Sequence, residues 1–400
     1  MKILISISDL SIGGAQIFAV RLANALSINH SIYIYNYELL QKHRESALLQ
    51  KLPPNAKVIY MPPLFSWLSM KLDKILCKIK LKPVVFNYVK KLHFKILTLF
   101  VYRIDIINTH LYHSDSFVVS ALKNSKIPVV TSDHGDYRFV IERGISTLNE
   151  MKDIVNRVNG IIYPSHSNTQ FICRYMDLYK ALEKTIYYGF LDEKSNGYTE
   201  SARKKLGISE KAFVFGMVAR GVSEKGWAEA IQAIDYVRSL STKEVHLILV
   251  GESDYLSSLK NFLKPELNSF VHFVGHSSEP NYWIESFDVA VLPTYFSGES
   301  LPNSIIEYLS LAKPVIATEV GGIPEMLNHN GKIAGFIIHL TQDGKADITS
   351  MADAMLSYVN QPDLLEKHSH IAKEASEKFQ MQTCLEAYES FFQQILKKAS

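Results

Sequence analysis

Residues 287–327 read FDVAVLPTYFSGESLPNSIIEYLSLAKPVIATEVGGIPEML. Two short apolar runs, Val289–Leu292 and Pro314–Thr318, stand on either side of a helical pattern. Buried runs of this length, separated by helical patterns, are typical of parallel strands built from β-α-β units. We therefore predict an α/β fold with a parallel sheet in this part of the chain.

The same alternation extends outward over the chain in two series of predicted strands. The first series is Ile3–Ile7, Ser31–Tyr37, Lys57–Met61, Asp105–Thr109, Pro128–Thr131 and Gly160–Tyr163. The second series adds Phe213–Val218, Val245–Val250, Val271–Val274 and Gly335–Ile338 to the two runs quoted above. Since 400 residues exceed the roughly 250–300 that one core accommodates, we predict two doubly wound, Rossmann-like domains.

The domain boundary is expected in the polar stretch GFLDEKSNGYTE at residues 189–200, which contains two glycines. We therefore assign residues 1–188 to an N-terminal domain and residues 189–400 to a C-terminal domain. From Met351 onward the pattern is helical and contains no strand. A terminal helix at about residues 380–400 could pack back against the first domain.

Composition excludes several classes of protein. Hydrophobic residues make up 47% of the chain and charged residues 21%, which argues against a disordered chain. A net charge of +3 argues against a nucleic-acid binder. Three scattered cysteines without a CxxC pattern favour reduced thiols over a zinc cluster or disulfides. The short apolar run at the N-terminus and the lack of a long apolar stretch predict a cytoplasmic protein.

One segment, Lys71–Arg103, has an unusual charge. It contains nine Lys or Arg against one acid, Asp73, and therefore carries a local charge of +8 among many aliphatic and aromatic residues. Such a pattern is typical of helices that dock on anionic lipids. The alternative is an ordinary amphipathic helical pair with a solvated basic face. We favour an anionic membrane surface as a partner, because the apolar content exceeds one core-facing stripe.

Two short motifs could hold phosphate. Gly13 and Gly14 follow the first strand, where backbone N–H groups at a helix start can approach an anion. Arg220 follows the first strand of the second domain and Lys225 lies five residues further on. An arginine fork and a lysine point charge together suit a diphosphate. Taken singly, the glycines could form only a tight turn, and the two cations could face solvent.

The quoted stretch supplies two glutamates eight positions apart, Glu299 and Glu307. We expect Ser300 to cap a helix with Pro302 in its first turn, which places Glu307 two turns in, about 12 Å along the axis. Glu307 could then accept hydrogen bonds from ribose hydroxyls and Glu299 from sugar hydroxyls. The alternative for Glu307 is a partly buried helix residue with a structural partner.

Histidines follow two strands of the first domain. His134 comes after Pro128–Thr131, while His110 and His113 come after the preceding strand. A histidine at such a strand end is a reasonable site residue, although a lone one is more often structural. The chain has neither an HExxH pair nor an Asp-x-Asp clamp. We therefore expect no metal.

Taken together, these motifs make the chain resemble the retaining glycosyltransferases of family 4, which have the GT-B fold. The resemblance covers nearly the whole chain. It is most specific over 287–327, where Glu299, Glu307, the strand Lys313–Thr318 and the turn Gly321–Glu325 appear in family order. Further matches are the first-loop glycines, Arg220 with Lys225, and His134.

The resemblance implies a nucleotide-sugar donor bound in a central cleft between the domains, with acceptor binding by the first domain. Arg220 and Lys225 would hold the diphosphate, helped by Gly13, Gly14 and the backbone at Ser300 and Leu301. Glu307 would bind ribose, while Glu299 and His134 would bind the transferred sugar. A UDP-sugar is the expected co-substrate, and no cofactor is expected.

The function expected from this resemblance is retaining, metal-independent transfer of a hexose or N-acetylhexosamine to a hydroxyl group. The expected acceptor is a lipid-linked or surface-polysaccharide glycan at the inner face of the cell membrane, as in building a capsule, the O-antigen of lipopolysaccharide or another surface polysaccharide. Three alternatives are open. They are a non-catalytic sugar-binding protein, a nucleotide-sugar epimerase and a phosphorylase on a similar scaffold.

Overall fold

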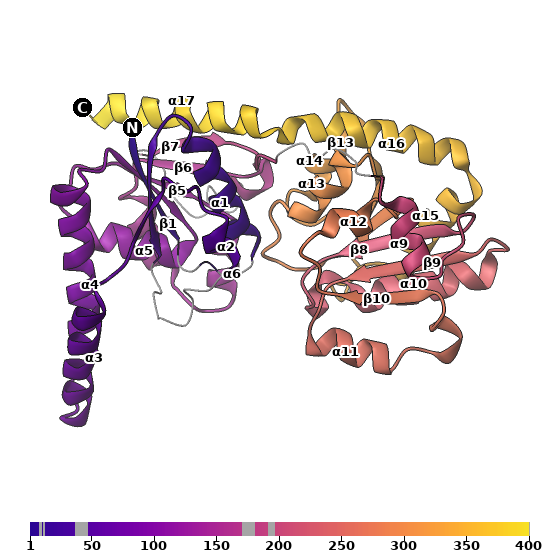
Figure 1. The fold of residues 1–400 in the computed structure, drawn as a ribbon, viewed down its shortest axis with the longest axis horizontal. Helices are drawn as coiled ribbons and strands as arrows, with labels where there is room; N and C mark the ends of the chain where they lie inside the picture. The colour runs from indigo at the N-terminus through magenta and orange to yellow at the C-terminus, as the bar shows by residue number, and fades with distance from the viewer. Residues whose placement is uncertain (8–9, 11–12, 37–46, 170–180, 191–196, 400) are drawn as a thin grey trace. The chain divides into compact units, whose positions relative to one another are not determined.

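Two parallel sheets, one in each of two compact units, organise the fold (Figure 1). The computed structural model describes residues 1–400 except 8–9, 11–12, 37–46, 170–180, 191–196 and 400. The first unit comprises Met1–Gly189 together with Met381–Ser400, and the second comprises Phe190–Gln380. Tyr37 of a predicted strand and residues 191–196 of the predicted linker lie outside the described residues.

The sheet of the first unit has seven parallel strands in the order β3-β2-β1-β4-β5-β6-β7. The order reverses between β1 and β4, which is where doubly wound sheets open a crevice for ligands. The strands are β1 (Lys2–Ile7), β2 (Ser31–Asn36), β3 (Lys57–Ile59), β4 (Ile106–His110), β5 (Val129–Ser132), β6 (Gly160–Tyr163) and β7 (Leu182–Thr185).

Helices form many of the connections between the strands of the first unit, and a helix ends its chain. Those between strands include α1 (Gly14–Leu26), α2 (Ala47–Gln50), α5 (Tyr112–Ala121), α6 (Asp136–Glu142) and α7 (Leu148–Val155). The last helix, α17 (Met381–Ala399), packs against α1. Its buried face repeats every three or four residues, as Met381, Cys384, Leu385, Tyr388, Phe391, Phe392 and Ile395.

A helical hairpin extends from the first unit (Figure 1). It consists of α3 (Pro63–Lys78) packed against α4 (Val85–Ile96), which continues as a π-helical turn, η2 (Leu97–Val101). The root of the hairpin is fixed by Phe94, which is fully buried and packs its ring 4.6 Å from Tyr35 and 5.3 Å from Phe117.

The sheet of the second unit has six parallel strands in the order β10-β9-β8-β11-β12-β15. They are β8 (Phe213–Val218), β9 (Val245–Val250), β10 (Val271–Gly275), β11 (Val289–Leu292), β12 (Val315–Thr318) and β15 (Gly335–Ile338). A short antiparallel pair, β13 (Asn328–His329) and β14 (Lys332–Ile333), interrupts the series. Phe190 and Gln380 form a parallel bridge where the chain enters and leaves this unit.

The helices of the second unit lie before, between and after its strands. They are α9 (Thr199–Lys205), α10 (Trp227–Leu240), α11 (Asp254–Asn261), α12 (Pro280–Ile284), α13 (Asn303–Ser310), α14 (Ile323–Leu327), α15 (Ile348–Asn360) and α16 (Pro362–Ser376). The 3-10 turns among the described residues of this unit are η3 (Ser223–Lys225), η4 (Pro265–Leu267) and η5 (Glu377–Phe379).

The predicted fold class of two doubly wound α/β domains is confirmed. Sequence reasoning missed β7, because Leu182-Glu183-Lys184-Thr185 is an edge strand that mixes polar and apolar residues and is only partly buried. No helix of the described residues is both long and apolar enough to span a bilayer.

We predict that Phe392→Ala lowers the free energy of unfolding by about 3–5 kcal/mol, because it empties a fully buried site on α17. Equilibrium urea unfolding measures the change. The matched control is Phe262→Ala at a site that is 87% exposed, which should shift stability by less than about 0.5 kcal/mol. Equal effects of the two variants would contradict the packing of α17 on the first unit.

Candidate active site

The predicted residues of the second unit gather at the carboxyl edge of its sheet. Arg220 follows β8, and Lys225 is the last residue of η3. Glu299 lies in the loop between β11 and α13. Since β8 and β11 are parallel neighbours, the loops that leave them meet at one edge. The fold therefore joins Lys225 to Glu299 across 74 positions of sequence.

Lys225 and Glu299 form a buried ion pair. The Lys225 ammonium contacts Glu299 Oε2, and each side chain is only 8% exposed. Thr294 Oγ1 donates a second hydrogen bond, of 3.0 Å, to the same carboxylate oxygen. Two buried charges are tolerated when each compensates the other and further hydrogen bonds are made. The sequence assigned the two residues to different parts of a ligand and did not predict their contact.

Backbone contacts hold the Lys225 loop against the Glu299 loop. Tyr295 N–H donates to the Glu224 carbonyl at 2.8 Å, and Thr294 Oγ1 lies 3.2 Å from the same oxygen. Gly226 adopts a left-handed φ of +83°, and a Cβ there would lie 2.2 Å from the carbonyl oxygen of Pro293. Only glycine therefore fits between Lys225 and the start of α10.

Both cations approach one aromatic ring. The Arg220 guanidinium lies 5.7 Å from the ring centroid of Phe296, and Lys225 Nζ lies 5.4 Å from it. Arg220 is exposed, while its carbonyl accepts hydrogen bonds from Trp227 Nε1 at 3.0 Å and from Val222 N–H at 2.8 Å. The backbone is thus fixed while the guanidinium remains accessible to an anion.

The helix that carries Glu307 begins later than predicted. Pro302 is the N-cap of α13 and makes no side-chain cap, and the first helical residue is Asn303. Ser300 is therefore not the cap, and Glu307 lies one turn into the helix rather than two. Ser300 and Leu301 are buried in the preceding loop, so their N–H groups belong to that loop and not to the helix N-terminus.

Two contacts fix the ends of this loop. Gly321 has a φ of +58°, and a Cβ there would lie 2.1 Å from the Glu299 carbonyl oxygen. Gly322 N–H donates to the Ser300 carbonyl at 2.8 Å.

Tyr308 connects α13 to the end of β8. Its hydroxyl accepts from Val218 N–H at 2.6 Å and donates to the Val218 carbonyl at 3.2 Å. Burial raises the pKa of Tyr308.

In the first unit, His134 belongs to a buried chain of hydrogen bonds. Its Nε2 contacts His110 Nδ1 at 2.8 Å, and His110 Nε2 contacts Asn108 Oδ1 at 2.9 Å. Its Nδ1 contacts the hydroxyl of Tyr188, whose ring stacks on Phe18 of α1 at 4.4 Å. The predicted His113 instead lies exposed on α5.

The side-chain amide of Asn108 determines which atom donates the proton in each hydrogen bond of this series. Asn108 Nδ2 donates to the Val130 carbonyl at 3.0 Å and to Ser132 Oγ at 3.1 Å, so Oδ1 must accept from His110. His110 then carries its proton on Nε2 and accepts on Nδ1 from His134. His134 in turn accepts from the Tyr188 hydroxyl. Both ring nitrogens of His134 therefore already have a hydrogen-bond partner. A sugar hydroxyl can bind Nδ1 only if the Tyr188 hydroxyl moves away from it.

Burial keeps these two imidazoles neutral. It lowers the pKa of His134 from 6.5 to about 3. It also lowers the pKa of His110 well below 6.5, with a further contribution from His134. A neutral imidazole can donate through one nitrogen and accept through the other, as the chain from Asn108 requires.

Glycines 13 and 14 stand at the start of α1. Gly13 is the N-cap in an extended conformation, and Gly14 is the first residue of the helix. Ser11 and Ile12 of the same loop lie outside the described residues. The predicted phosphate contact of this helix start stays a prediction, as do the roles of the other site residues.

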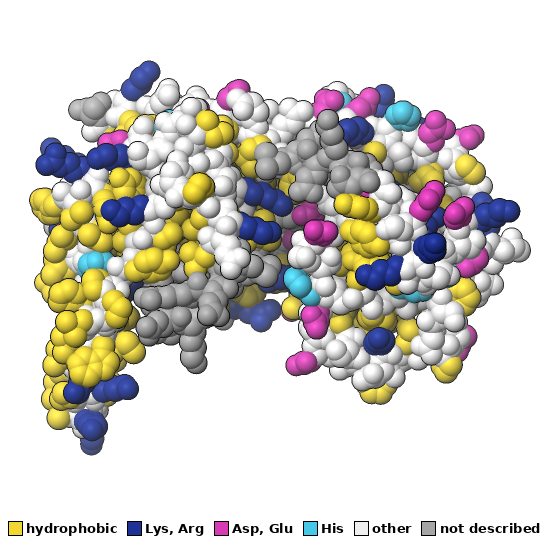
Figure 2. Space-filling view, viewed as in Figure 1, with side chains coloured by type: hydrophobic (Ala, Val, Ile, Leu, Met, Phe, Trp, Pro, Cys, Tyr) yellow, Lys and Arg dark blue, Asp and Glu magenta, His cyan; other side chains and the backbone are white. Residues whose placement is uncertain are grey.

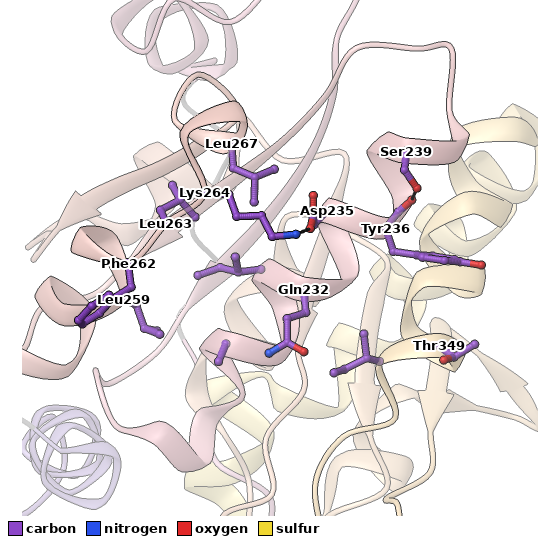
Figure 3. Close-up of a pocket in the computed structure, with 13 residues that line it drawn as sticks. Gln232, Asp235, Tyr236, Ser239, Leu259, Phe262, Leu263, Lys264, Leu267 and Thr349 are labelled. Carbon is purple, nitrogen blue, oxygen red and sulfur yellow. Dashed lines mark hydrogen bonds and ion pairs between the residues drawn. The ribbon is translucent and has the colours of Figure 1, made fainter.

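A separate hollow of about 730 Å³ lies in the second unit among α10, α11 and the start of α15 (Figure 3). Asp235 and Lys264 form an ion pair of 2.5 Å at its wall, and Phe262 and Tyr236 contribute aromatic surface. None of the predicted site residues lines it. Within the described ranges, no cluster of three or more His, Cys, Asp or Glu side chains is arranged to hold a metal.

We predict that stability falls as the pH drops from about 6.5 toward 3, because in this window the unfolded histidines bind protons that the native ones exclude. His134 alone should contribute about 1.4 kcal/mol per pH unit. His134→Gln should flatten the pH dependence of urea unfolding, whereas His276→Gln, at an exposed site, should not. Identical slopes in wild type and His134→Gln would contradict a neutral, buried His134.

Comparison with known families accounts for most of the chain. The family model described as Glycosyl transferases group 1 matches residues 199–378, and the model Glycosyltransferase Family 4 matches residues 12–183. N-acetyl-alpha-D-glucosaminyl L-malate synthase of Bacillus anthracis is 21% identical over 301 residues, covering 74% of this chain and 76% of that protein.

The chain is also similar to a second relative in sequence and to a solved structure. A Campylobacter jejuni protein named N,N'-diacetylbacillosaminyl-diphospho-undecaprenol alpha-1,3-N-acetylgalactosaminyltransferase is 24% identical over 56% of this chain and 62% of its own. The crystal structure of Anabaena Alr3699/HepE in complex with UDP and glucose has a TM-score of 0.76 at 19% identity, covering 98% of this chain and 100% of that one. That likeness confirms the predicted GT-B fold. The chain belongs to the family 4, or group 1, glycosyltransferases.

Proposed function

We propose that this glycosyltransferase moves a hexose or N-acetylhexosamine from a UDP-sugar to a hydroxyl group, with retention of the anomeric configuration and without a metal. The observation that carries the proposal is the Lys225–Glu299 pair beside Arg220 at the carboxyl edge of the second sheet. The UDP in the Anabaena structure supports the choice of nucleotide.

The donor diphosphate binds to Arg220 and Lys225. The exposed guanidinium offers paired N–H donors to phosphate oxygens, and the ammonium adds a compact charge. As a phosphate approaches, Lys225 exchanges part of its contact with Glu299 for the new anion. Glu299 can then accept hydrogen bonds from sugar hydroxyls, while Glu307 accepts from the ribose. Backbone N–H groups at Ser300, Leu301, Gly13 and Gly14 complete the binding of the donor.

Transfer proceeds on one face of the sugar. The bond between the anomeric carbon and the diphosphate oxygen breaks, and a bond to the acceptor oxygen forms on the same side. The acceptor proton passes to the leaving phosphate oxygen, so the charges balance. Arg220 and Lys225 stabilise the negative charge that builds up on the diphosphate, a task that other transferases assign to a divalent cation. His134, once Tyr188 releases it, binds the transferred sugar.

The acceptor is a lipid-linked or surface-polysaccharide glycan, in the cytoplasm at the inner face of the membrane. The name of the Campylobacter relative, which includes a diphospho-undecaprenol, supports a lipid-linked acceptor. So does a second relative, which is named as an amylovoran biosynthesis glycosyltransferase of Erwinia amylovora and is 26% identical over 39% of this chain. The basic segment Lys71–Arg103 supports work at an anionic surface.

We predict that Arg220→Ala and Lys225→Ala each lower turnover by about 10- to 1000-fold, because each removes a charge that stabilises the leaving diphosphate. Release of nucleotide from UDP-sugars in the presence of acceptor measures the effect. Lys264→Ala, at an exposed ion pair of the separate hollow, is the matched control and should retain wild-type turnover.

Near-normal turnover of a folded Arg220→Ala, Lys225→Ala double variant would refute this assignment. Conversion of the nucleotide sugar without any acceptor would favour the epimerase alternative. Binding of the nucleotide sugar with no turnover, under any acceptor, would favour a sugar-binding protein.

We also predict that a chelator of divalent cations leaves turnover unchanged, because Arg220 and Lys225 supply the positive charge at the diphosphate. Nucleotide release is compared in EDTA, in excess Mg²⁺ and in excess Mn²⁺ after dialysis. Loss of activity in EDTA that Mg²⁺ or Mn²⁺ restores would overturn the metal-independent mechanism while leaving the assignment as a transferase intact.

A further inference from the structure

Helix α3 presents a continuous apolar stripe to solvent. Its members are spaced by three or four residues and therefore lie on one face of the helix. Each is between 42% and 63% exposed, although each is a large aliphatic residue: Leu64, Leu68, Leu72, Ile75 and Ile79. Contiguous exposed apolar surface of this kind marks an interaction site.

A second stripe runs along α4 and η2. Its members repeat every four residues and are between 43% and 71% exposed: Val84, Tyr88, Leu92, Ile96 and Phe100. The hairpin thus exposes apolar side chains on both of its helices, while Phe94 on another face of α4 holds it to the core. Figure 2 shows hydrophobic and basic side chains together over this part of the molecule.

Lysines border the stripe of α3. Lys71, Lys74 and Lys78 are spaced by three and four residues, so they form their own row on the same helix. On a helical projection this row lies beside the apolar stripe. Lys71 Nζ also lies 4.7 Å from the ring centroid of Trp67, which is 56% exposed. An apolar row next to a lysine row is typical of a helix that lies in a membrane interface.

The one acid of the segment, Asp73, joins the two helices of the hairpin. Asp73 accepts from Val85 N–H at 2.8 Å through one oxygen and from Phe86 N–H at 2.9 Å through the other. The carboxylate therefore caps the start of α4 from α3 and joins the two helices. The hairpin is held as one body that presents basic and apolar groups outward.

We infer that the α3–α4 hairpin docks in the plane of an anionic lipid bilayer, with the α3 stripe at the boundary between headgroups and acyl chains and its lysines at the lipid phosphates. The inference rests on the proposed lipid-linked acceptor and specifies how the enzyme reaches it. A second copy of the chain fits less well, because the local charge of +8 would oppose a like-charged hairpin.

The test uses the full-length protein and sedimentation with vesicles. Vesicles of phosphatidylcholine and phosphatidylglycerol in equal parts should bind the protein, and pure phosphatidylcholine should bind it about tenfold or more weakly. Added salt should weaken binding to the anionic vesicles. Leu68→Asn with Ile75→Asn, and separately Lys71→Gln with Lys74→Gln and Lys78→Gln, should each lower anionic binding about tenfold or more.

The chain contains its own spectroscopic reporter. Of its three tryptophans, Trp227 and Trp283 are buried and only Trp67 is exposed. Anionic vesicles should therefore shift the fluorescence of the wild type to shorter wavelength, and Trp67→Phe should abolish the shift. The matched control is Phe262→Asn with Lys264→Gln, an exposed aromatic and an exposed lysine of the second unit, which should bind like wild type.

Separate results test the hairpin and the enzyme. The inference is overturned if the wild type fails to sediment, if the stripe variants sediment as well as wild type, or if light scattering shows a dimer that those variants dissociate. The stripe variants should still release nucleotide with a water-soluble acceptor, and loss of that activity would overturn a docking role. Vesicle binding without any nucleotide release would instead refute the proposed function alone.

Discussion

The buried ion pair of Lys225 and Glu299 is the contact on which the candidate donor site depends. Neither charge has bulk water around it, so each is tolerable only because the other is present and Thr294 adds a hydrogen bond. The pair also joins the loop after β8 to the loop after β11, and Gly226 allows these two backbones to approach closely. Gly321 in the loop after β12 allows a similar approach to the Glu299 backbone. Under the proposed function, the donor phosphate and sugar compete for partners that are already charged and already in place.

The first unit also buries polar side chains that need hydrogen-bond partners, but here the side chains are neutral. Asn108, His110, His134 and Tyr188 each satisfy the next, and the amide of Asn108 determines which atom donates at every step. A protonated imidazole in this chain would place two donors against each other, in addition to its desolvation cost. Burial and hydrogen bonding therefore favour the same protonation state.

The hairpin follows a different rule from the rest of the first unit. In the core of this unit, large apolar side chains from separate elements pack together, as Tyr35 and Phe117 do. On α3 and α4, leucine, isoleucine and aromatic side chains also face water, and lysines border the row on α3. Exposing these apolar side chains to water is unfavourable. Their transfer to the interface of an anionic membrane is favourable, because acyl chains contact the apolar side chains and lipid phosphates contact the lysines.

Sequence by itself determined the two parallel sheets, because their strands are short apolar runs separated by amphipathic helices, as over residues 287–327. It also pointed to Arg220, Lys225 and Glu299 at the carboxyl edge of the second sheet and to His134 at the carboxyl edge of the first, because the parallel strands of a sheet end at the same edge. Only the tertiary structure decided that Lys225 and Glu299 pair, that Thr294 and Phe296 join them, and that α13 begins at Asn303. Thr294 and Phe296 had a signal, since they directly follow β11, whereas Asn108 and Tyr188 had none. Such contacts form between side chains that are far apart in the sequence and close together in a low-dielectric interior. The local periodicity of the sequence does not show which distant side chains will be in contact.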